Sequence, residues 1–163
     1  LFSQVGDGVE PGRLISDLNR FMWRKRNPIG MSCLAALFDP EHRRVQYAVA
    51  GQMSMVRLRA VAGHAYTDPL PGDGPLVGDR PETEYTPYIV DSSPYDLFLI
   101  CSEAMGAIWQ VNTDTAVHLR MRLENAGTKP LNELHGDLLE MLGHPNRRRG
   151  STPVVVVRER GVH

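Results

Sequence analysis

Glu103 is a carboxylate whose position in the sequence is suited to binding a divalent cation. It directly follows residues 97–101, an apolar run of strand length that indicates a central, buried strand. A carboxylate at the end of such a strand can hold a divalent cation, because hard cations prefer oxygen ligands. It can equally cap a helix at residues 104–109, where the positive end of the helix dipole would face it. The residues alone favour the cap.

Two other groups of side chains could carry chemistry. Arg147, Arg148 and Arg149 could hold a phosphoryl group through charged hydrogen bonds, although so short a basic run is more often a solvated loop. Cys33 and Cys101 both lie in apolar runs that indicate strands. A catalytic thiolate needs an exposed, electropositive setting, so we expect both cysteines to be buried, reduced and inert.

The sequence lacks the common patterns of zinc, nucleotide and serine-hydrolase sites. None of its six histidines lies three or four residues from another, and it contains no Cys-x-x-Cys. The Gly-Asp-Gly segments at residues 6–8 and 72–74 lack the Gly-Lys-Ser/Thr ending of a nucleotide loop. No Gly-x-Ser-x-Gly elbow is present for a serine nucleophile.

Length and charge narrow the class of protein. The chain has 163 residues, which predicts a single domain over residues 1–163. Its 18 basic and 19 acidic side chains give a net charge of −1, which argues against a nucleic-acid or anionic-membrane partner. The longest apolar run, residues 33–38, is far shorter than a membrane span. The start shows no signal-peptide pattern and the two cysteines form no disulfide framework, so we expect a cytoplasmic protein.

The first half of the sequence predicts one helix and three strands. The helix opens at Pro11, which a first turn tolerates, and ends in a basic run at residues 24–26. Four apolar residues at helical spacing predict the face that packs on the core: Leu14, Leu18, Phe21 and Met22. Residues 31–38 predict a buried strand, and the alternating residues 45–49 and 53–59 extend it to an antiparallel meander.

The second half predicts a loop, further strands and a group of helices. Residues 68–75 hold three prolines and two glycines and predict a loop. Residues 84–90 predict an edge strand, since Pro87 cannot donate to a neighbour. The remaining elements are a central strand, two helices and a final buried strand, expected at residues 97–101, 112–125, 130–143 and 154–157. Strands and helices are segregated along the chain, which predicts a layered α+β fold.

Four segments, read in order, carry a resemblance to a known family. They are residues 30–40 with 45–52, residues 74–78 with Tyr85, residues 93–105, and residues 150–158. They are similar to four family motifs: a hairpin ending in Tyr-x-Asn-Ala-Gly-His, a Pro-Leu-Gly segment, a Pro-Gly-Asp, strand and Thr-Asp-Gly stretch, and an Asp-Asp-x-Thr followed by a last strand. The family is the metal-dependent (PPM-type, SpoIIE-like) bacterial serine/threonine phosphatases.

The resemblance implies a layered antiparallel β-sandwich flanked by helices, of which this chain is the C-terminal portion. The family's first metal-binding aspartate lies on strands upstream of the opening helix, so we expect the fold to be incomplete at its N-terminus. An incomplete sandwich exposes an apolar edge, which predicts a partner surface or a homodimer. The resemblance also requires the last strand to lie beside the strand at residues 97–101.

The resemblance implies two Mn²⁺ or Mg²⁺ ions that activate a water against a phosphoserine or phosphothreonine. This chain departs from the family at each position that bears on the metals. Thr-Asp-Gly is replaced by Ser102-Glu103-Ala104, and Asp-Asp by Gly150-Ser151. The Asn and His of the hairpin motif are replaced by Val49 and Gln52. We therefore expect Mn²⁺ or Mg²⁺ to bind weakly or not at all.

Three hypotheses of function remain open at this point. The first, which we favour, is a degenerate phosphatase-like domain that acts by binding in bacterial signalling, as the output of a response regulator or in sigma-factor partner switching. Its partner would be a phosphorylatable regulatory protein or a sigma-factor regulator. The second is a working Mn²⁺-dependent phosphatase with Glu103 among its ligands. The third is an unrelated α+β interaction domain.

Overall fold

The computed structural model describes residues 9–25, 30–61, 64–94, 96–102, 130–141 and 155–158. The chain divides into two compact units, each assembled from segments that are distant in sequence. The first unit comprises residues 1–53 and 72–92, and the second comprises residues 54–71 and 93–163. The single domain that the length predicts stays a prediction. In the part of the chain that the structure describes, no helix is long and apolar enough to span a membrane.

The first unit is built on a three-stranded antiparallel sheet. Its strands are β1 (Cys33–Asp39), β2 (Arg44–Ala50) and β5 (Tyr88–Asp91), in the order β1-β2-β5. Cys33 pairs with Ala50, and Asp39 pairs with Arg44 at the other end of the hairpin. Ring stacking between Tyr47 and Tyr88, with centroids 5.4 Å apart, joins β2 to β5. The predicted hairpin at residues 31–49 is therefore confirmed.

The turn between β1 and β2 is organised by one carboxylate. Asp39 accepts the backbone N–H of His42 at 3.1 Å and the Nε of Arg44 at 3.1 Å. The hydrogen bond from the His42 backbone is the main reason why the pKa of Asp39 is lowered, and the charges of His42 and Arg44 add to it. Arg43 takes a left-handed φ of 49°, which lets the chain reverse within four residues.

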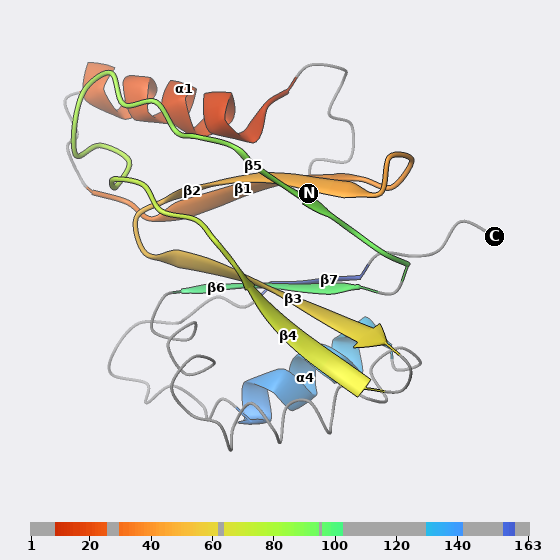
Figure 1. Ribbon diagram of the computed structural model, residues 1–163. Coiled ribbons are helices and arrows are strands. Elements are labelled where there is room, and N and C mark those ends of the chain that lie inside the picture. Colours follow the sequence, from red (N-terminus) through yellow and green to blue (C-terminus); the bar gives the residue numbers. More distant parts are fainter. Residues whose placement is uncertain are drawn as a thin grey trace. The chain divides into compact units, whose positions relative to one another are not determined.

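Helix α1 (Pro11–Arg24) lies along one face of this sheet (Figure 1). Ile15 is 1% exposed and packs with Ala48 and Ala50 of β2. The prediction that Leu14 and Phe21 face the core is wrong, since they are 54% and 55% exposed. Pro11, Ile15 and Asn19, spaced by four residues, form the centre of the buried stripe instead. The other two residues of the predicted face, Leu18 and Met22, are half-buried and pack against this core, so that part of the prediction is confirmed.

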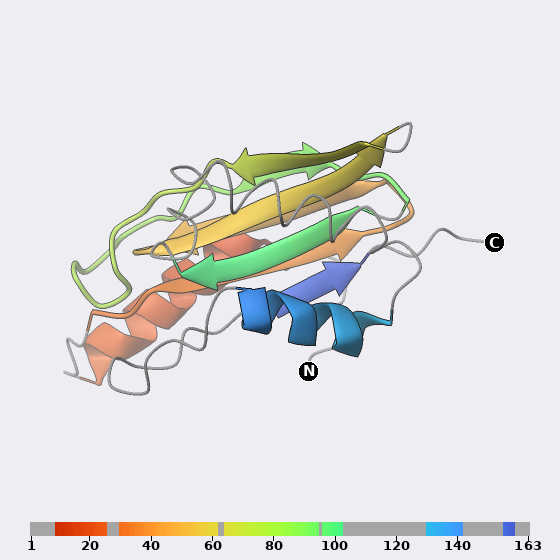
Figure 2. The ribbon, with the colours of Figure 1, turned by 90° about the horizontal axis from the view of Figure 1, so that it is seen from below.

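The second unit holds a four-stranded antiparallel sheet. Its strands are β3 (Met53–Val61), β4 (His64–Leu70), β6 (Leu97–Ser102) and β7 (Val155–Arg158), in the order β4-β3-β6-β7. Figure 2 shows β3 between β4 and β6, with helix α4 (Leu131–Met141) beside β7. β7 pairs with β6, and Leu97 lies opposite Arg158. This pairing confirms that the last strand lies beside the strand at residues 97–101, as the resemblance requires.

Several element predictions are wrong in informative ways. The third strand of the predicted meander belongs to the other sheet, because the chain leaves β2 through Gly51, whose φ is +65°. Part of the predicted loop at residues 68–75 is strand β4, in which Pro69 faces Val56; an edge strand tolerates a proline. Strand β5 begins only at Tyr88, after Pro87. The predicted helices at residues 104–109 and 112–125 lie outside the described residues.

The burial of the strands follows their place in the sheets. β2 is central in its sheet and carries four consecutive buried residues, Tyr47 to Ala50. β1 was predicted to be buried, yet each of its seven residues is half-buried, because β1 is an edge strand in the described part of the sheet. Two antiparallel sheets with helices confirm the α+β class.

Candidate functional site

The end of β2 carries the two described positions at which the chain departs from the family hairpin. Val49 is 2% exposed and contributes only an isopropyl group. A Cβ on Gly72 would lie 2.6 Å from Val49 Cγ2, so the 72–74 segment packs directly on this side chain. The position that the resemblance assigns to an Asn is therefore an apolar packing position.

Gln52 lies just beyond, in a turn fixed by the backbone. The Gln52 N–H donates to Ser32 Oγ at 2.9 Å, and the Gly51 N–H donates to the Gly74 carbonyl at 2.9 Å. A Cβ on Gly51 would approach Ser32 Oγ to 2.5 Å, so only glycine fits this tight, left-handed turn. The Gln52 side chain is therefore exposed, and its backbone is held in a tight turn.

These residues do not fit a divalent metal site. A valine side chain has no lone pair, and Mn²⁺ or Mg²⁺ needs several oxygen ligands. Among the described residues, no group of three His, Cys, Asp or Glu side chains comes together to hold a metal ion. The described end of the hairpin therefore supplies no donor set of the kind that the resemblance implies.

The other residues that the sequence analysis names as site candidates belong to the second unit. Cys101 and Ser102 end β6; Cys101 is 1% exposed, and Ser102 Oγ is buried without a hydrogen bond to any described residue. The candidates that follow lie outside the described residues: Glu103, Ala104, Arg147, Arg148, Arg149, Gly150 and Ser151. Their roles stay predictions.

Burial makes the two thiols poor nucleophiles, although the prediction that Cys33 is fully buried is wrong: Cys33 is half-buried, on the edge strand β1. Burial raises the pKa of Cys101 to about 11 and also raises the pKa of Cys33. Because the thiolate reacts, we expect iodoacetamide at pH 8 to modify Cys101 about 100-fold more slowly than an ordinary free cysteine. Mass spectrometry of timed samples measures this rate, and the guanidinium-unfolded chain is the control. Alkylation of Cys101 at the unfolded rate in the native protein would contradict this expectation.

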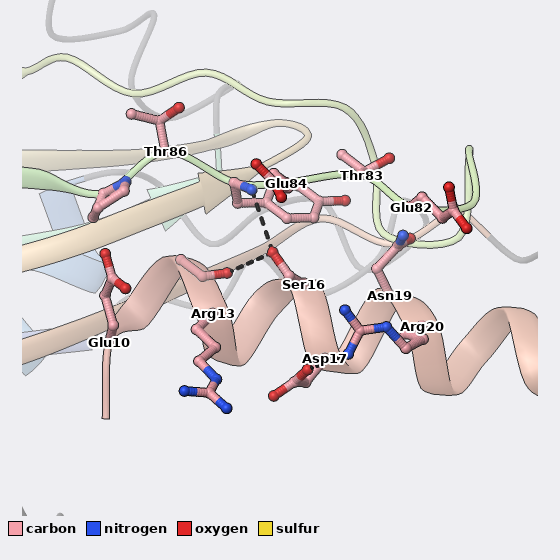
Figure 3. Close-up of a pocket in the computed structure, with 13 residues that line it drawn as sticks. Glu10, Arg13, Ser16, Asp17, Asn19, Arg20, Glu82, Thr83, Glu84 and Thr86 are labelled. Carbon is pink, nitrogen blue, oxygen red and sulfur yellow. Dashed lines mark hydrogen bonds and ion pairs between the residues drawn. The ribbon is translucent and has the colours of Figure 1, made fainter. Parts of the chain in front are cut away.

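A groove of about 830 Å³ runs between α1 and residues 82–87 in the first unit. Ser16 joins its two walls: Oγ donates to the Gly12 carbonyl at 2.9 Å and lies 3.3 Å from Tyr85 N, whose N–H it accepts (Figure 3). Asn19 is 1% exposed, donates to the Arg80 carbonyl at 2.9 Å, and accepts the Gly78 N–H at 2.7 Å. These bonds hold the groove in one shape.

Charged side chains line the rim of this groove. Arg20 and Asp17 of α1 form an ion pair at 2.7 Å. The opposite wall carries Glu82 and Glu84, both exposed. Sequence reasoning missed this groove, because its walls come from segments about 70 residues apart. The signal available in the sequence was two nearby glutamates, Glu82 and Glu84, in a segment without basic residues.

The geometry of the two sheets has counterparts among solved structures. A crystal structure of a bacterial serine phosphatase matches with a TM-score of 0.70 and 14% identity, covering 100% of this chain and 75% of that one. A mutant bacterial serine phosphatase matches with a TM-score of 0.65 and 17% identity, covering 90% of this chain. The SiaA-PP2C domain of Pseudomonas aeruginosa matches with a TM-score of 0.64 and 17% identity, covering 91% of this chain. The chain spans 64% and 61% of the last two proteins.

These likenesses define the class: the chain has the fold of a PPM-type phosphatase domain. Residues 1–153 match the sequence profile described as Stage II sporulation protein E (SpoIIE), so the chain belongs to the SpoIIE family. It is thus a phosphatase-like domain of a bacterial signalling family, and the hypothesis of an unrelated α+β domain is wrong. A search of curated proteins found no match.

Proposed function

We propose that this chain is a degenerate phosphatase-like regulatory domain that acts by binding a protein partner rather than by hydrolysing phosphate. The observation that carries this proposal is the packing of Val49 beneath residues 72–74, at the position where the family pattern has an Asn. A position filled in this way cannot serve polar chemistry without repacking the end of β2. The substitution of Asp-Asp by Gly150-Ser151 supports the same conclusion.

The partner in this proposal is a phosphorylatable regulatory protein or a sigma-factor regulator. A domain that keeps a phosphatase fold but lacks its metal ligands could still recognise the protein that an active relative dephosphorylates. The chain would work in the cytoplasm, since Cys33 and Cys101 are both free thiols, as a reducing compartment maintains. Arg147, Arg148 and Arg149 are the candidates for contacting a phosphoryl group.

The alternative is an active Mn²⁺- or Mg²⁺-dependent phosphatase. A related fold, the catalytic domain of the phosphatase PstP, holds two manganese ions; it has 16% identity and a TM-score of 0.63. Glu103 keeps a carboxylate at one family ligand position. In this alternative, the glutamate would hold a metal ion together with aspartates upstream in the protein.

Calorimetric Mn²⁺ titration and hydrolysis of a phosphoserine peptide by the full-length protein separate the two functions. We expect no saturable Mn²⁺ binding at micromolar concentrations and no phosphate release. Tight Mn²⁺ binding with turnover that Glu103→Ala abolishes would overturn the proposal. Glu133→Ala is the matched control, because Glu133 is an exposed carboxylate on α4.

A gain-of-function variant tests whether the missing Asp-Asp pair is the cause of weak Mn²⁺ binding. The double substitution Gly150→Asp and Ser151→Asp returns the two carboxylates of the family pattern to the chain. If their loss explains weak binding, the affinity for Mn²⁺ should rise at least about tenfold, since hard cations gain affinity with each carboxylate ligand. An unchanged affinity would mean that these positions are not what limits metal binding.

A further inference from the structure

Helix α1 carries a second apolar stripe, which is exposed. Leu14 and Phe21 are both more than half exposed and lie seven residues apart, with Leu18 between them. Residues separated by four and then three positions share one side of a helix. Lys25 continues this stripe by four residues, and its Nζ lies 5.7 Å from the centre of the Phe21 ring. Leu14, Leu18, Phe21 and Lys25 together form the outer stripe of α1.

The outer stripe lies on the side of α1 opposite the groove. Ser16, whose hydroxyl accepts the Tyr85 N–H, is about half a turn around the helix from the stripe. Leu18 is half-buried and packs against the core, as do Cys33 and Ala35 of β1. In the described part of the first sheet, β1 is an edge strand. The outer stripe therefore flanks α1 on the side of the sheet edge.

The C-terminal end of the outer stripe is basic. Arg24 and Lys25 are exposed, and neither forms an ion pair with any described residue. Asp17 is the carboxylate within α1, and it forms its ion pair with Arg20. The stripe thus complements a surface that is apolar along its length and negatively charged at one end.

We propose that the outer stripe of α1 binds an amphipathic helix of a partner protein, with acidic side chains at the end that meets Arg24 and Lys25. A helix is the matching shape, because apolar residues at alternating spacings of four and three are those by which two helices interlock. Helix α1 has 14 residues and is about 21 Å long, so the partner helix contributes about four turns.

An acidic helix fits this surface better than an anionic membrane does. Membranes attract clusters of four or more Lys and Arg side chains, whereas Arg24 and Lys25 are two cations beside a short apolar stripe. The inference rests on the proposed function, the binding of a protein partner, and names the surface of the first unit that carries it. Opposite charges at one end of the stripe would also fix the direction of the bound helix.

Fluorescence anisotropy with the full chain and a labelled synthetic helix tests the proposal. The probe is a peptide of about 20 residues, with leucines at alternating spacings of four and three and glutamates in its first two turns. We expect saturable binding that weakens as salt is added. A scrambled peptide of the same composition, and one with lysines in place of the glutamates, should each bind at least about tenfold more weakly.

Paired variants separate the apolar and the charged parts of the stripe. The double variant Leu14→Gln and Phe21→Gln should lower the affinity at least about tenfold, since two apolar contacts are lost. Its control is Ile89→Gln, which removes an exposed apolar side chain from β5 and should leave the affinity unchanged. All three residues are exposed, and circular dichroism confirms that the variants keep the fold.

The charged variant is the double substitution Arg24→Gln and Lys25→Gln. It should weaken binding about three- to tenfold and remove most of the salt dependence. Arg13→Gln is the matched control, because Arg13 is an exposed cation of α1 that lines the groove on the opposite side. Equal losses in the two variants would mean that general attraction, rather than the outer stripe, holds the peptide, and would overturn the proposal.

Three further results would overturn it. One is equal binding of the scrambled peptide, and another is an affinity that the Leu14 and Phe21 variant leaves unchanged. The third is a different occupant: a dimer in sedimentation equilibrium, or binding to phosphatidylserine vesicles, that this same variant abolishes. Hydrolysis of the phosphoserine peptide is measured separately. Turnover there refutes the proposed function and leaves helix binding intact, whereas loss of helix binding alone refutes only the role of the outer stripe.

Discussion

Gly12→Ala is expected to lower the free energy of unfolding by about 2–4 kcal/mol. A Cβ at this position would lie 2.1 Å from the Tyr85 carbonyl oxygen and 3.2 Å from its carbonyl carbon. Both contacts are with backbone, so no rotamer change can relieve them, and α1 must move away from residues 82–87. Overpacking of this kind costs about 1–3 kcal/mol, and loss of the Ser16 bond to Tyr85 adds about 1 kcal/mol.

Gly136→Ala is the matched control for this prediction. Gly136 lies within α4, and a Cβ there would meet no atom within 4 Å. Alanine is favoured over glycine in a helix interior by about 0.5–1 kcal/mol, so this variant should be neutral or more stable. Urea denaturation followed by circular dichroism compares the two. Hydrogen exchange should show faster opening of α1 amides in Gly12→Ala alone, and equal stability of the two variants would refute the close approach.

Helix α1 shows which features of the fold can be predicted from the sequence and which cannot. The helix itself was predictable, because Pro11 and the basic end at Arg24 are local signals. The face of the helix that is buried was not predictable, because Leu14 and Ile15 are adjacent and similarly apolar, and only packing on the sheet decides which of them is buried. The approach of Gly12 to Tyr85 depends on a segment 73 positions away, and no local pattern encodes it.

The same limit applies to the candidate sites. The resemblance located Val49 and Gln52 from a short motif, and the structure supplies what the motif could not: the packing of Gly72 on Val49 and the bond from Gln52 to Ser32. The groove has no motif, because its two walls are unrelated segments. In the sequence, a carboxylate such as Glu84 cannot be told from any other surface charge, and only the folded structure shows that it lines the groove.

The strand boundaries illustrate the competition between composition and pairing. Residues 68–70 have the composition of a loop, yet they extend β4, because Asp68 and Leu70 pair with Arg57 and Met55 of β3. An edge position removes the penalty that Pro69 would impose in a central strand. Composition predicts a loop at residues 68–70, and tertiary pairing overrides that preference.

Asp96→Ala should destabilise the second unit by about 2–4 kcal/mol. Asp96 is 1% exposed, and it lies in the segment that resembles the family's Pro-Gly-Asp. Its Oδ2 accepts Arg59 Nη2 at 2.9 Å and the Ser93 N–H at 2.9 Å, and Arg59 Nε lies 3.2 Å from Oδ1. Removing one partner of a buried pair costs about 3–5 kcal/mol, reduced here because the Arg59 side chain is 32% exposed.

Two companion variants separate the charge of Asp96 from its hydrogen bonds. Asp96→Asn keeps an acceptor for the Ser93 N–H but loses the charge opposite Arg59, so it should cost about half as much as the alanine variant. Asp17→Ala removes the exposed partner of Arg20, at 2.7 Å, and should cost only about 0.2–0.5 kcal/mol. Urea midpoints of the three variants give this ranking. If Asp96→Ala and Asp17→Ala lose equal stability, burial of the Asp96 pair contributes nothing, and the turn before β6 is held by other contacts.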